Sequence, residues 1–338
     1  MTKSVTIHNQ NFDERKMNLH LKKLKVILSM ISSISILAMT GCTDGAPDNS
    51  ASTKPETVAT VETAATVESS RESGTSEDTA GQTDTFGPTP ASAPAETSVD
   101  YSSAFAGLEG CAVIYSPQNQ TYAYTDQSMC EIEISPYSTF KIISALLGLE
   151  YGVIQDESST MDYDGTQYPV PDWNKNVTFK EAMTTSCIWY FHQVLEAVGQ
   201  EQVENALASL NYGNGDVSQW EGSGVNPLPD LNGFWQASSL KISPVEQVRV
   251  LADIFEGNSM FADQNVDIVK SVMLVDASAA GNIYGKTGSG VDGQAWFVGF
   301  LEKDGQRRYI AVCLNDAAHE EEISGGTARE IALDILKS

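Results

Sequence analysis

Hydrophobic and polar positions along the chain of 338 residues fall into three successive patterns. Short apolar runs on either side of a polar turn predict two strands, at 111–115 and 121–125. Residues 138–151 are apolar on nearly every side, which is typical of a helix buried in the centre of a domain. Three more apolar runs predict strands near the C-terminus: 282–286, 295–302 and 308–315.

Capping boxes mark the starts of helices between these two groups of strands. Thr178 opens one helix, and Ser243, followed by Pro244 at the first helical position, opens another. A helix at about 327–336 closes the chain. Strands at both ends with helices between them predict an α/β (α+β) fold. We expect a central antiparallel sheet built from both termini, flanked by helices, with an inserted all-helical lobe.

Residues 1–41 have the layout of a bacterial lipoprotein signal peptide. Lysines precede an apolar run over 26–39, which is too short and too rich in serine for a comfortable membrane span. Small residues end the run directly before Cys42. We therefore expect Cys42 to be the lipidated first residue of an extracytoplasmic protein anchored to the cell membrane. The alternative is an ordinary signal peptide with an incidental cysteine.

Residues 42–100 predict a disordered acidic linker rich in Thr and Ser, because so few apolar side chains cannot offset the entropy of ordering it. From residue 43 onward this stretch has eleven acidic, two basic and one aromatic side chain. Residues 101–338 are long enough for one domain with a real core. That domain has 32 acidic and 12 basic residues, a charge that repels phosphate backbones, so we expect no nucleic-acid partner. The sequence identifies no protein partner.

Four cysteines remain in the domain: Cys111, Cys130, Cys187 and Cys313. None has the close paired spacing of a zinc site, so we expect no metal. Export permits disulfides, and the first two cysteines flank the predicted hairpin. The sequence leaves open whether these two pair or remain buried free thiols.

Nucleophilic chemistry is indicated by Ser138 and Lys141, an S-x-x-K motif at a predicted helix start. Side chains three apart share a helix face, and the backbone N–H of a residue at the helix start is free to hold an oxyanion. Burial of Lys141 favours the neutral amine, which is the form a base needs. The domain has only His192 and His319, neither near a nucleophile-elbow motif, so a Ser-His-Asp arrangement is poorly supported. Alone, S-x-x-K is a weak signal that occurs about once by chance in such a chain.

Further motifs strengthen this interpretation. Lys286, Thr287 and Gly288 form K-T-G on a predicted strand, where the glycine lets a substrate backbone approach and the lysine supplies charge for a carboxylate. Ser186 follows a capped helix and is suited to relaying a proton to a leaving nitrogen. A Y-G-N motif follows at 212–214. The order S-x-x-K, S-x-x, K-T-G resembles that of the penicillin-recognising serine enzymes.

Within that superfamily, residues of about 103–337 resemble the class D, oxacillinase-type β-lactamases. The resemblance also rests on Trp235 and on the L-K-I-S-P segment at 240–244. It implies that Ser138 attacks the β-lactam ring of penicillin-type antibiotics. It further implies that carbon dioxide converts Lys141 to N6-carboxylysine, the general base, with no other cofactor. The indole N–H of Trp235 would hydrogen-bond to this carbamate.

The resemblance also assigns substrate contacts. The backbone N–H of Ser289 would complete the oxyanion hole, although this family often has a larger residue at that position. Thr287 and Gly288 lie on the same strand and would also contact substrate. Ile188 would keep the lysine pocket apolar, where sensors and transpeptidases tend to have asparagine. Arg329 is the residue placed to bind the substrate carboxylate, with a solvated helix charge as the alternative.

Three activities are compatible with this resemblance: a β-lactamase, a non-hydrolytic β-lactam sensor, and a D-Ala-D-Ala peptidase. The β-lactamase is the main expectation. Sensors are fused to membrane segments and a cytoplasmic protease, and the sequence suggests no membrane segment beyond the signal peptide.

Overall fold

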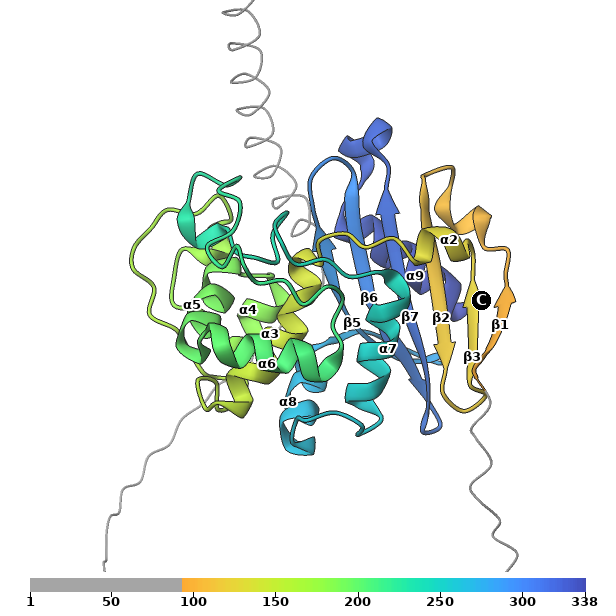
Figure 1. The fold of residues 1–338 in the computed structure, drawn as a ribbon, viewed down its shortest axis with the longest axis horizontal. Helices are drawn as coiled ribbons and strands as arrows, with labels where there is room; N and C mark the ends of the chain where they lie inside the picture. The colour runs from red at the N-terminus through yellow and green to blue at the C-terminus, as the bar shows by residue number, and fades with distance from the viewer. Residues whose placement is uncertain (1–92) are drawn as a thin grey trace, which may run out of the picture. The chain divides into compact units, whose positions relative to one another are not determined.

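The computed structural model describes residues 93–338. The expected signal peptide, Cys42 and the linker as far as residue 92 lie outside the described residues. The described part contains a seven-stranded sheet in the order β1-β3-β2-β7-β6-β5-β4, with helices on both faces (Figure 1). The predicted α/β fold, with a sheet built from both ends of the domain, is therefore confirmed.

The strands and helices have the following bounds in the structure. The strands are β1 Ala95–Ser98, β2 Gly110–Ser116, β3 Thr121–Tyr124, β4 Leu274–Ser278, β5 Gly281–Ser289, β6 Gln294–Lys303 and β7 Gln306–Asn315. The α-helices are α2 Gln127–Cys130, α3 Lys141–Glu150, α4 Phe179–Thr184, α5 Ile188–Val198, α6 Gln200–Leu210, α7 Pro244–Phe255, α8 Asp263–Val272 and α9 Gly325–Lys337.

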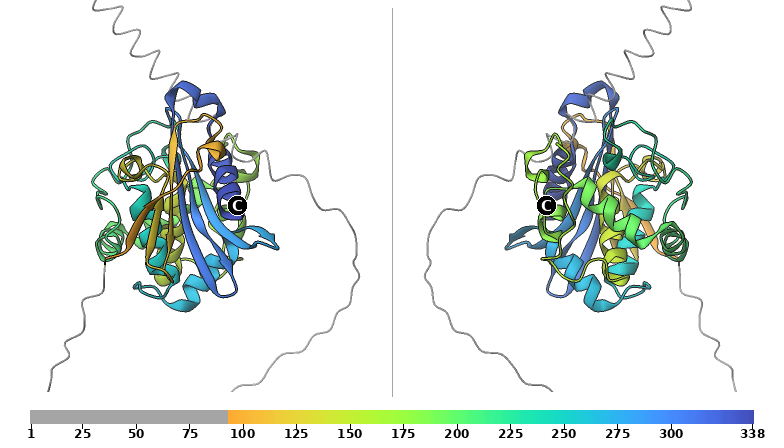
Figure 2. Two further views of the ribbon diagram at one scale, coloured as in Figure 1. Left: turned by 90° about the vertical axis from the view of Figure 1, so that its right-hand side faces the viewer. Right: turned by 90° about the vertical axis from the view of Figure 1, so that its left-hand side faces the viewer.

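Two hydrophobic cores lie on opposite faces of the sheet. Alternate residues of β2 show the division, because Val113 faces the core with α3, α5 and α7, whereas Ala112 faces the core with α9. In Figure 1, α7 lies in front of the sheet and α9 behind it, and Figure 2 shows the sheet from both sides. Helix α3 is buried along nearly its whole length, as its apolar sequence predicts. It passes between the sheet and the helical lobe.

Local signals in the sequence correctly locate several helix starts. Thr178 accepts a hydrogen bond from the backbone N–H of Glu181, and the carboxylate of Glu181 accepts one in return, which completes the capping box of α4. Ser243 caps α7 in the same way, with Pro244 at its first position. These reciprocal bonds satisfy N–H groups that the first helical turn leaves unpaired.

Two edge strands of the sheet, β1 and β4, were not predicted from the sequence. Residues 95–98 form β1, parallel to β3, so the folded part begins before the expected linker boundary at residue 100. All four residues of β1 are exposed, and no apolar alternation marks them as a strand. Strand β4, at the opposite edge, was not predicted. Both strands depend on a neighbour that offers free backbone groups rather than on their own side chains.

Candidate active site

Ser138 and Lys141 come together in a tight first turn. The predicted α-helix from Ser138 begins instead with a 3-10 turn, η2 Tyr137–Phe140, and becomes α-helical at Lys141. Side chains three apart eclipse one another in a 3-10 turn. The Nζ atom of Lys141 consequently lies 2.7 Å from Oγ of Ser138, a contact that a proton can cross directly.

Lys141 is completely buried, and its surroundings favour the neutral amine. Burial lowers the pKa of Lys141 well below its usual range, and the positive charge of Lys286 lowers it further. The ring of Phe191 lies 5.8 Å from Nζ, and Ile188 is also buried in this core. Ser138 is itself mostly buried, with 9% of the residue exposed. The pair therefore combines a buried amine, whose surroundings favour its neutral form, with a hydroxyl that keeps a small exposed area.

Ser186 and Lys286 form a second hydroxyl–amine pair. Nζ of Lys286 donates to Oγ of Ser186 at 3.0 Å and to the carbonyl oxygen of Thr287 at 3.1 Å. Ser186 lies in the short connection between α4 and α5 with a left-handed φ of 57°, which is uncommon for serine and costs energy unless its surroundings hold it. Burial lowers the pKa of Lys286 to about 7.

We expect penicillin to acylate Ser138 more slowly as the pH rises through about 7. The cation of Lys286 attracts the substrate carboxylate and is lost above its lowered pKa. The Lys286→Arg variant stays charged, so its rate should not show this decline. Added bicarbonate should move the decline to higher pH if it places an anion on Lys141. pH profiles of the second-order acylation rate test this, and a flat wild-type profile between about pH 6 and 9 would contradict it.

The segment around Trp235 is joined to the nucleophile turn by backbone bonds. The N–H of Tyr137 donates to the carbonyl oxygen of Trp235 at 3.0 Å, and Ile134 and Ile242 exchange backbone bonds farther along. The Trp235 ring lies 6.1 Å from the ring of Phe140. Its indole N–H has no hydrogen-bond partner among residues 93–338. The indole N–H of Trp235 is therefore an available donor, and its contact with a carbamate on Lys141 remains a prediction.

Two polar residues that the sequence analysis did not assign to the site also hold the nucleophile turn. Nζ of Lys241 donates to Oγ of Ser135 at 2.8 Å, and Nε2 of Gln247 donates to Oγ1 of Thr139 at 3.0 Å. Gln247 is buried on α7, and a polar residue at a buried helix position needs a partner. A glutamine on the apolar face of a predicted helix is the sequence signal that could have identified Gln247.

The Y-G-N motif has a structural part in the site. Gly213 has a left-handed φ of 49°, and a Cβ atom there would lie 1.9 Å from the carbonyl oxygen of Lys241. Asn214 accepts a bond from the backbone N–H of Lys241 at 3.0 Å and donates to the carbonyl oxygen of Ser239 at 2.9 Å. The motif thus fixes the end of the segment that carries Trp235.

The K-T-G residues of β5 lie along a part of the strand that β4 does not cover. Strand β4 pairs with β5 only as far as Tyr284, and no strand within residues 93–338 continues along that edge. A Cβ atom on Gly288 would lie 3.2 Å from the carbonyl oxygen of Pro136, so glycine permits this close approach to the nucleophile turn. Thr287 faces α9, and Oγ of Ser289 accepts a bond from the N–H of Gly325 at 2.9 Å. The side chain of Ser289 thus binds the start of α9.

The comparisons with known proteins agree with this geometry. The family model described as the penicillin binding protein transpeptidase domain matches residues 110–337. The chain belongs to this family. Of the two relatives described next, one is named as a regulatory protein and the other as a probable β-lactamase. Membership therefore places the chain in the penicillin-recognising serine enzyme superfamily, whereas turnover is a separate question.

Two relatives and one solved structure show the extent of the likeness. The regulatory protein BlaR1 of Bacillus licheniformis is 33% identical over 243 residues, which are 70% of this chain and 38% of BlaR1. The chain thus spans about two-fifths of that relative. The probable β-lactamase YbxI of Bacillus subtilis is 30% identical over 244 residues, 71% of this chain and 85% of YbxI. The crystal structure of a class D β-lactamase from Bacillus subtilis aligns over 71% of this chain and 94% of its own, at 30% identity and a TM-score of 0.63.

Arg329 is not brought to the nucleophile by any contact in the structure. Its guanidinium donates to the carbonyl oxygen of Val275 on β4 at 2.9 Å, at the part of the edge that β4 covers. The interaction fixes α9 against an edge strand that was not predicted. Binding of the substrate carboxylate by Arg329 remains a prediction without support from this geometry.

The structure also bears on the cysteines, on metal sites and on membrane spans. The domain cysteines Cys111, Cys130, Cys187 and Cys313 are buried free thiols in the structure. Within residues 93–338, no group of three or more His, Cys, Asp or Glu side chains is arranged to hold a metal ion. The same residues contain no helix with the length and hydropathy of a membrane span.

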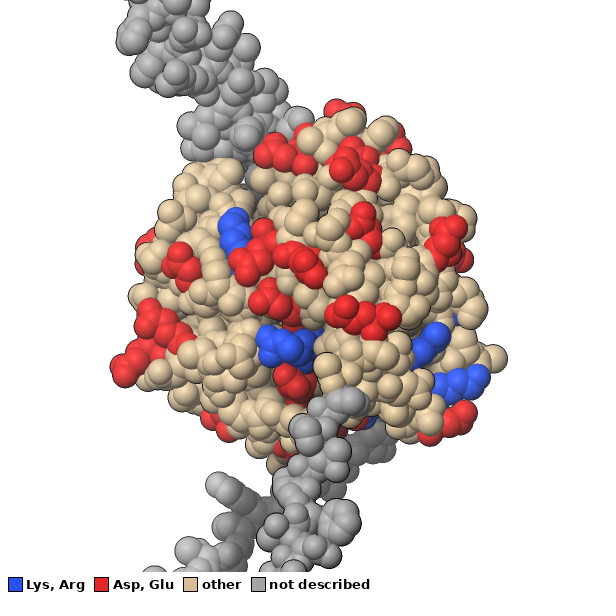
Figure 3. Space-filling model, turned by 45° about the vertical axis from the view of Figure 1, so that its right-hand side comes forward, with Lys and Arg blue, Asp and Glu red and all other residues tan. Residues whose placement is uncertain are grey.

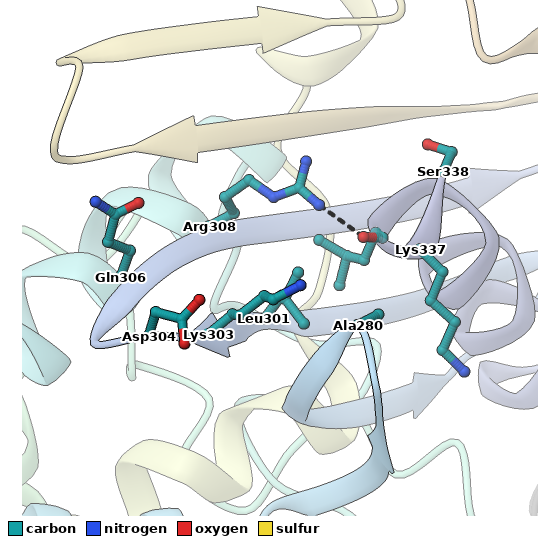
Figure 4. Close-up of a pocket in the computed structure, with 9 residues that line it drawn as sticks. Ala280, Leu301, Lys303, Asp304, Gln306, Arg308, Lys337 and Ser338 are labelled. Carbon is teal, nitrogen blue, oxygen red and sulfur yellow. Dashed lines mark hydrogen bonds between the residues drawn. The ribbon is translucent and has the colours of Figure 1, made fainter.

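A hollow of about 470 Å³ lies at the opposite end of the sheet, between the β6–β7 turn and the end of α9 (Figure 4). Arg308 in its wall donates to the carbonyl oxygen of Leu336. Its lining includes Lys337 and Ser338, but the hydroxyl of Ser338 donates to the carbonyl oxygen of Ile335 and has no hydrogen bond to a lysine within residues 93–338.

Acidic side chains are spread over much of the face seen in Figure 3, with basic ones in a few places. An anionic substrate therefore depends on local cations such as Lys286.

Proposed function

We propose that this chain is a class D serine β-lactamase, which hydrolyses the β-lactam amide of penicillin-type antibiotics through an acyl-enzyme on Ser138. The observation that carries the proposal is the buried Lys141, whose surroundings lower its pKa and favour the neutral amine, at 2.7 Å from Ser138 Oγ. A base that stays neutral can activate the serine and, afterwards, a water. Ile188 supports the hydrolase, because an apolar residue there leaves the base without a competing hydrogen-bond partner.

The surroundings of Lys141 fit carboxylation by carbon dioxide. The neutral amine is the reactive form. The Trp235 ring lies 6.1 Å from the ring of Phe140, the residue before Lys141, and its indole N–H has no hydrogen-bond partner among residues 93–338. When present, the carbamate supplies an anionic base for acylation and deacylation. Trp235 would hold it by its indole N–H, and the Ser138 hydroxyl would donate to it.

The remaining steps belong to the chain's own groups. Oγ of Ser138 attacks the lactam carbonyl carbon and gives up its proton to the base. The backbone N–H groups of Ser138 and Ser289 hold the developing oxyanion. Ser186 passes a proton from Lys286 to the leaving nitrogen, along the 3.0 Å contact between them. Water then releases the acyl group and restores Ser138.

A non-hydrolytic receptor is the second candidate, and the 33% identity to BlaR1 favours it. One experiment separates the two functions. The full chain is mixed with the chromogenic cephalosporin nitrocefin, hydrolysis is followed optically, and the intact mass is then measured. Steady turnover with unmodified protein at the end supports the β-lactamase. One stable acyl adduct per chain, without turnover, identifies a receptor or binding protein.

We also propose that Cys42 carries a lipid and holds the protein at the outer side of the cell membrane. The proposal rests on the short apolar run that ends in small residues before this cysteine. The Cys42→Ala protein is expected to leave the membrane fraction, because removal of the anchor leaves no covalent lipid. Fractionation of cells followed by immunoblotting measures this. Full retention of the variant in membranes would contradict the proposal.

A further inference from the structure

A narrow, mostly apolar pocket adjoins the nucleophile turn. Its lining consists of Tyr137, Val225, Leu231, Gln236, Ala237, Ser289, Gly290 and Val291. Tyr137 precedes the nucleophile, and Ser289 ends the strand that carries K-T-G. Gly290 packs so closely on the Tyr137 ring that a Cβ atom there would lie 2.3 Å from it. The pocket therefore lies between the end of β5 and the segment that follows Trp235.

Gln236 is the amide side chain in this lining, and its nitrogen has no partner. The residue is only 5% exposed, and its Nε2 is buried without a hydrogen-bond partner. Its backbone N–H donates to the carbonyl oxygen of Gly233 at 3.0 Å, and Ala237 follows with a left-handed φ of 48°. Because the neighbouring Trp235 accepts the bond from Tyr137, this turn fixes Gln236 beside the nucleophile.

A buried amide donor without a partner is unfavourable, and such groups in proteins are commonly completed by a ligand or water. Penicillins have an exocyclic amide on the ring carbon next to the scissile carbonyl. Its carbonyl oxygen accepts one hydrogen bond and its N–H donates one, which matches the donor and acceptor of a carboxamide.

We propose that Gln236 binds the exocyclic amide in the side chain of β-lactams. It would thereby select β-lactams that carry an acylamino group. The inference rests on the proposed acylation of Ser138 by β-lactams, and it holds for a hydrolase and a receptor alike. Gln236 acts as a specificity residue, because it contacts the side chain of the substrate and not the reacting atoms.

The test compares benzylpenicillin, which has the acylamino group, with 6-aminopenicillanic acid, which has a free amine in its place. The measured quantity is the second-order rate of Ser138 acylation, from intact mass against time. Gln236→Leu keeps the side-chain volume and removes the amide. We expect its rate with benzylpenicillin to fall about tenfold, which corresponds to one lost hydrogen bond, and its rate with 6-aminopenicillanic acid to change less than about twofold.

Two further variants control the experiment. Gln236→Glu keeps the size but loses the N–H donor at neutral pH, so it should show the same selective loss. Gln193→Leu removes a half-buried amide that donates to the carbonyl oxygen of Asp162 outside the pocket, and it should acylate like the wild type. Thermal unfolding of each variant checks that the fold is kept.

The outcomes separate the two proposals. Equal rate changes with both substrates, or no change with either, would overturn the role of Gln236 while leaving the acylation of Ser138 intact. A wild-type chain that neither compound acylates would overturn the proposed function, and the inference with it.

Discussion

Ser138→Ala is expected to abolish covalent labelling by penicillin, with a loss of at least about three orders of magnitude in rate. The hydroxyl of Ser138 lies 2.7 Å from Nζ of Lys141 at the start of a helix, where the residue keeps 9% of its surface exposed. Its backbone N–H, which has no partner among residues 93–338, holds the oxyanion without moving. Labelling with a fluorescent penicillin, followed by electrophoresis and intact mass, measures the loss.

Ser186→Ala is the matched control for this experiment. It removes a serine hydroxyl that Lys286 contacts, but it leaves the nucleophile in place. Labelling should therefore persist at a rate lowered about 100-fold, the usual effect of losing one proton-transfer group. Persistent labelling of Ser138→Ala would show that another serine is acylated, with Ser186 the first to examine.

Removal of carbon dioxide is expected to lower penicillin hydrolysis, and added bicarbonate is expected to restore it. Carboxylation joins a neutral amine to carbon dioxide and releases a proton, so low pH opposes it and should make the effect largest. Burial lowers the pKa of Lys141 and so favours the neutral amine that carbon dioxide needs. Hydrolysis is measured in degassed and in bicarbonate-containing buffer at several pH values.

Trp235→Ala should strengthen this dependence, because it removes the unpaired indole donor that we propose holds the carbamate. We expect deacylation to slow by about 100-fold and acylation by less, with partial rescue by bicarbonate. Trp220→Ala is a suitable control. Its indole donates to Glu196, and its ring stacks on Phe234 at 5.0 Å, so its loss leaves the Trp235 donor in place. An unchanged hydrolysis rate without carbon dioxide would make the free amine of Lys141 the base.

Much of the site follows from local sequence. The spacing of Ser138 and Lys141 puts both on one face of any right-handed helix, and the apolar residues around the lysine predict its burial. The capping boxes locate the helices before Ser186 and after the Trp235 segment. K-T-G was correctly assigned to a strand. These features depend on neighbours within a few residues, so the sequence pattern contains them.

Other parts depend on contacts between distant segments. The left-handed φ of Tyr137 and the 3-10 turn after it accompany its hydrogen bond to Trp235, about a hundred residues away. Ser186 and Lys286, also a hundred residues apart, meet only when β5 is in the sheet. Arg329 looked free on its helix, but it binds β4, which carries no strand pattern of its own.

The sequence by itself determined that Ser138 and Lys141 share one helix face, that K-T-G lies on a strand, and that the arrangement is α/β, because each is encoded by spacing, hydropathy and capping over short distances. The tertiary structure decided the 2.7 Å serine–lysine contact, the lowered pKa of both lysines and the burial of Gln236. These properties arise from desolvation and from hydrogen bonds between segments, which exist only once the helical lobe packs on the sheet.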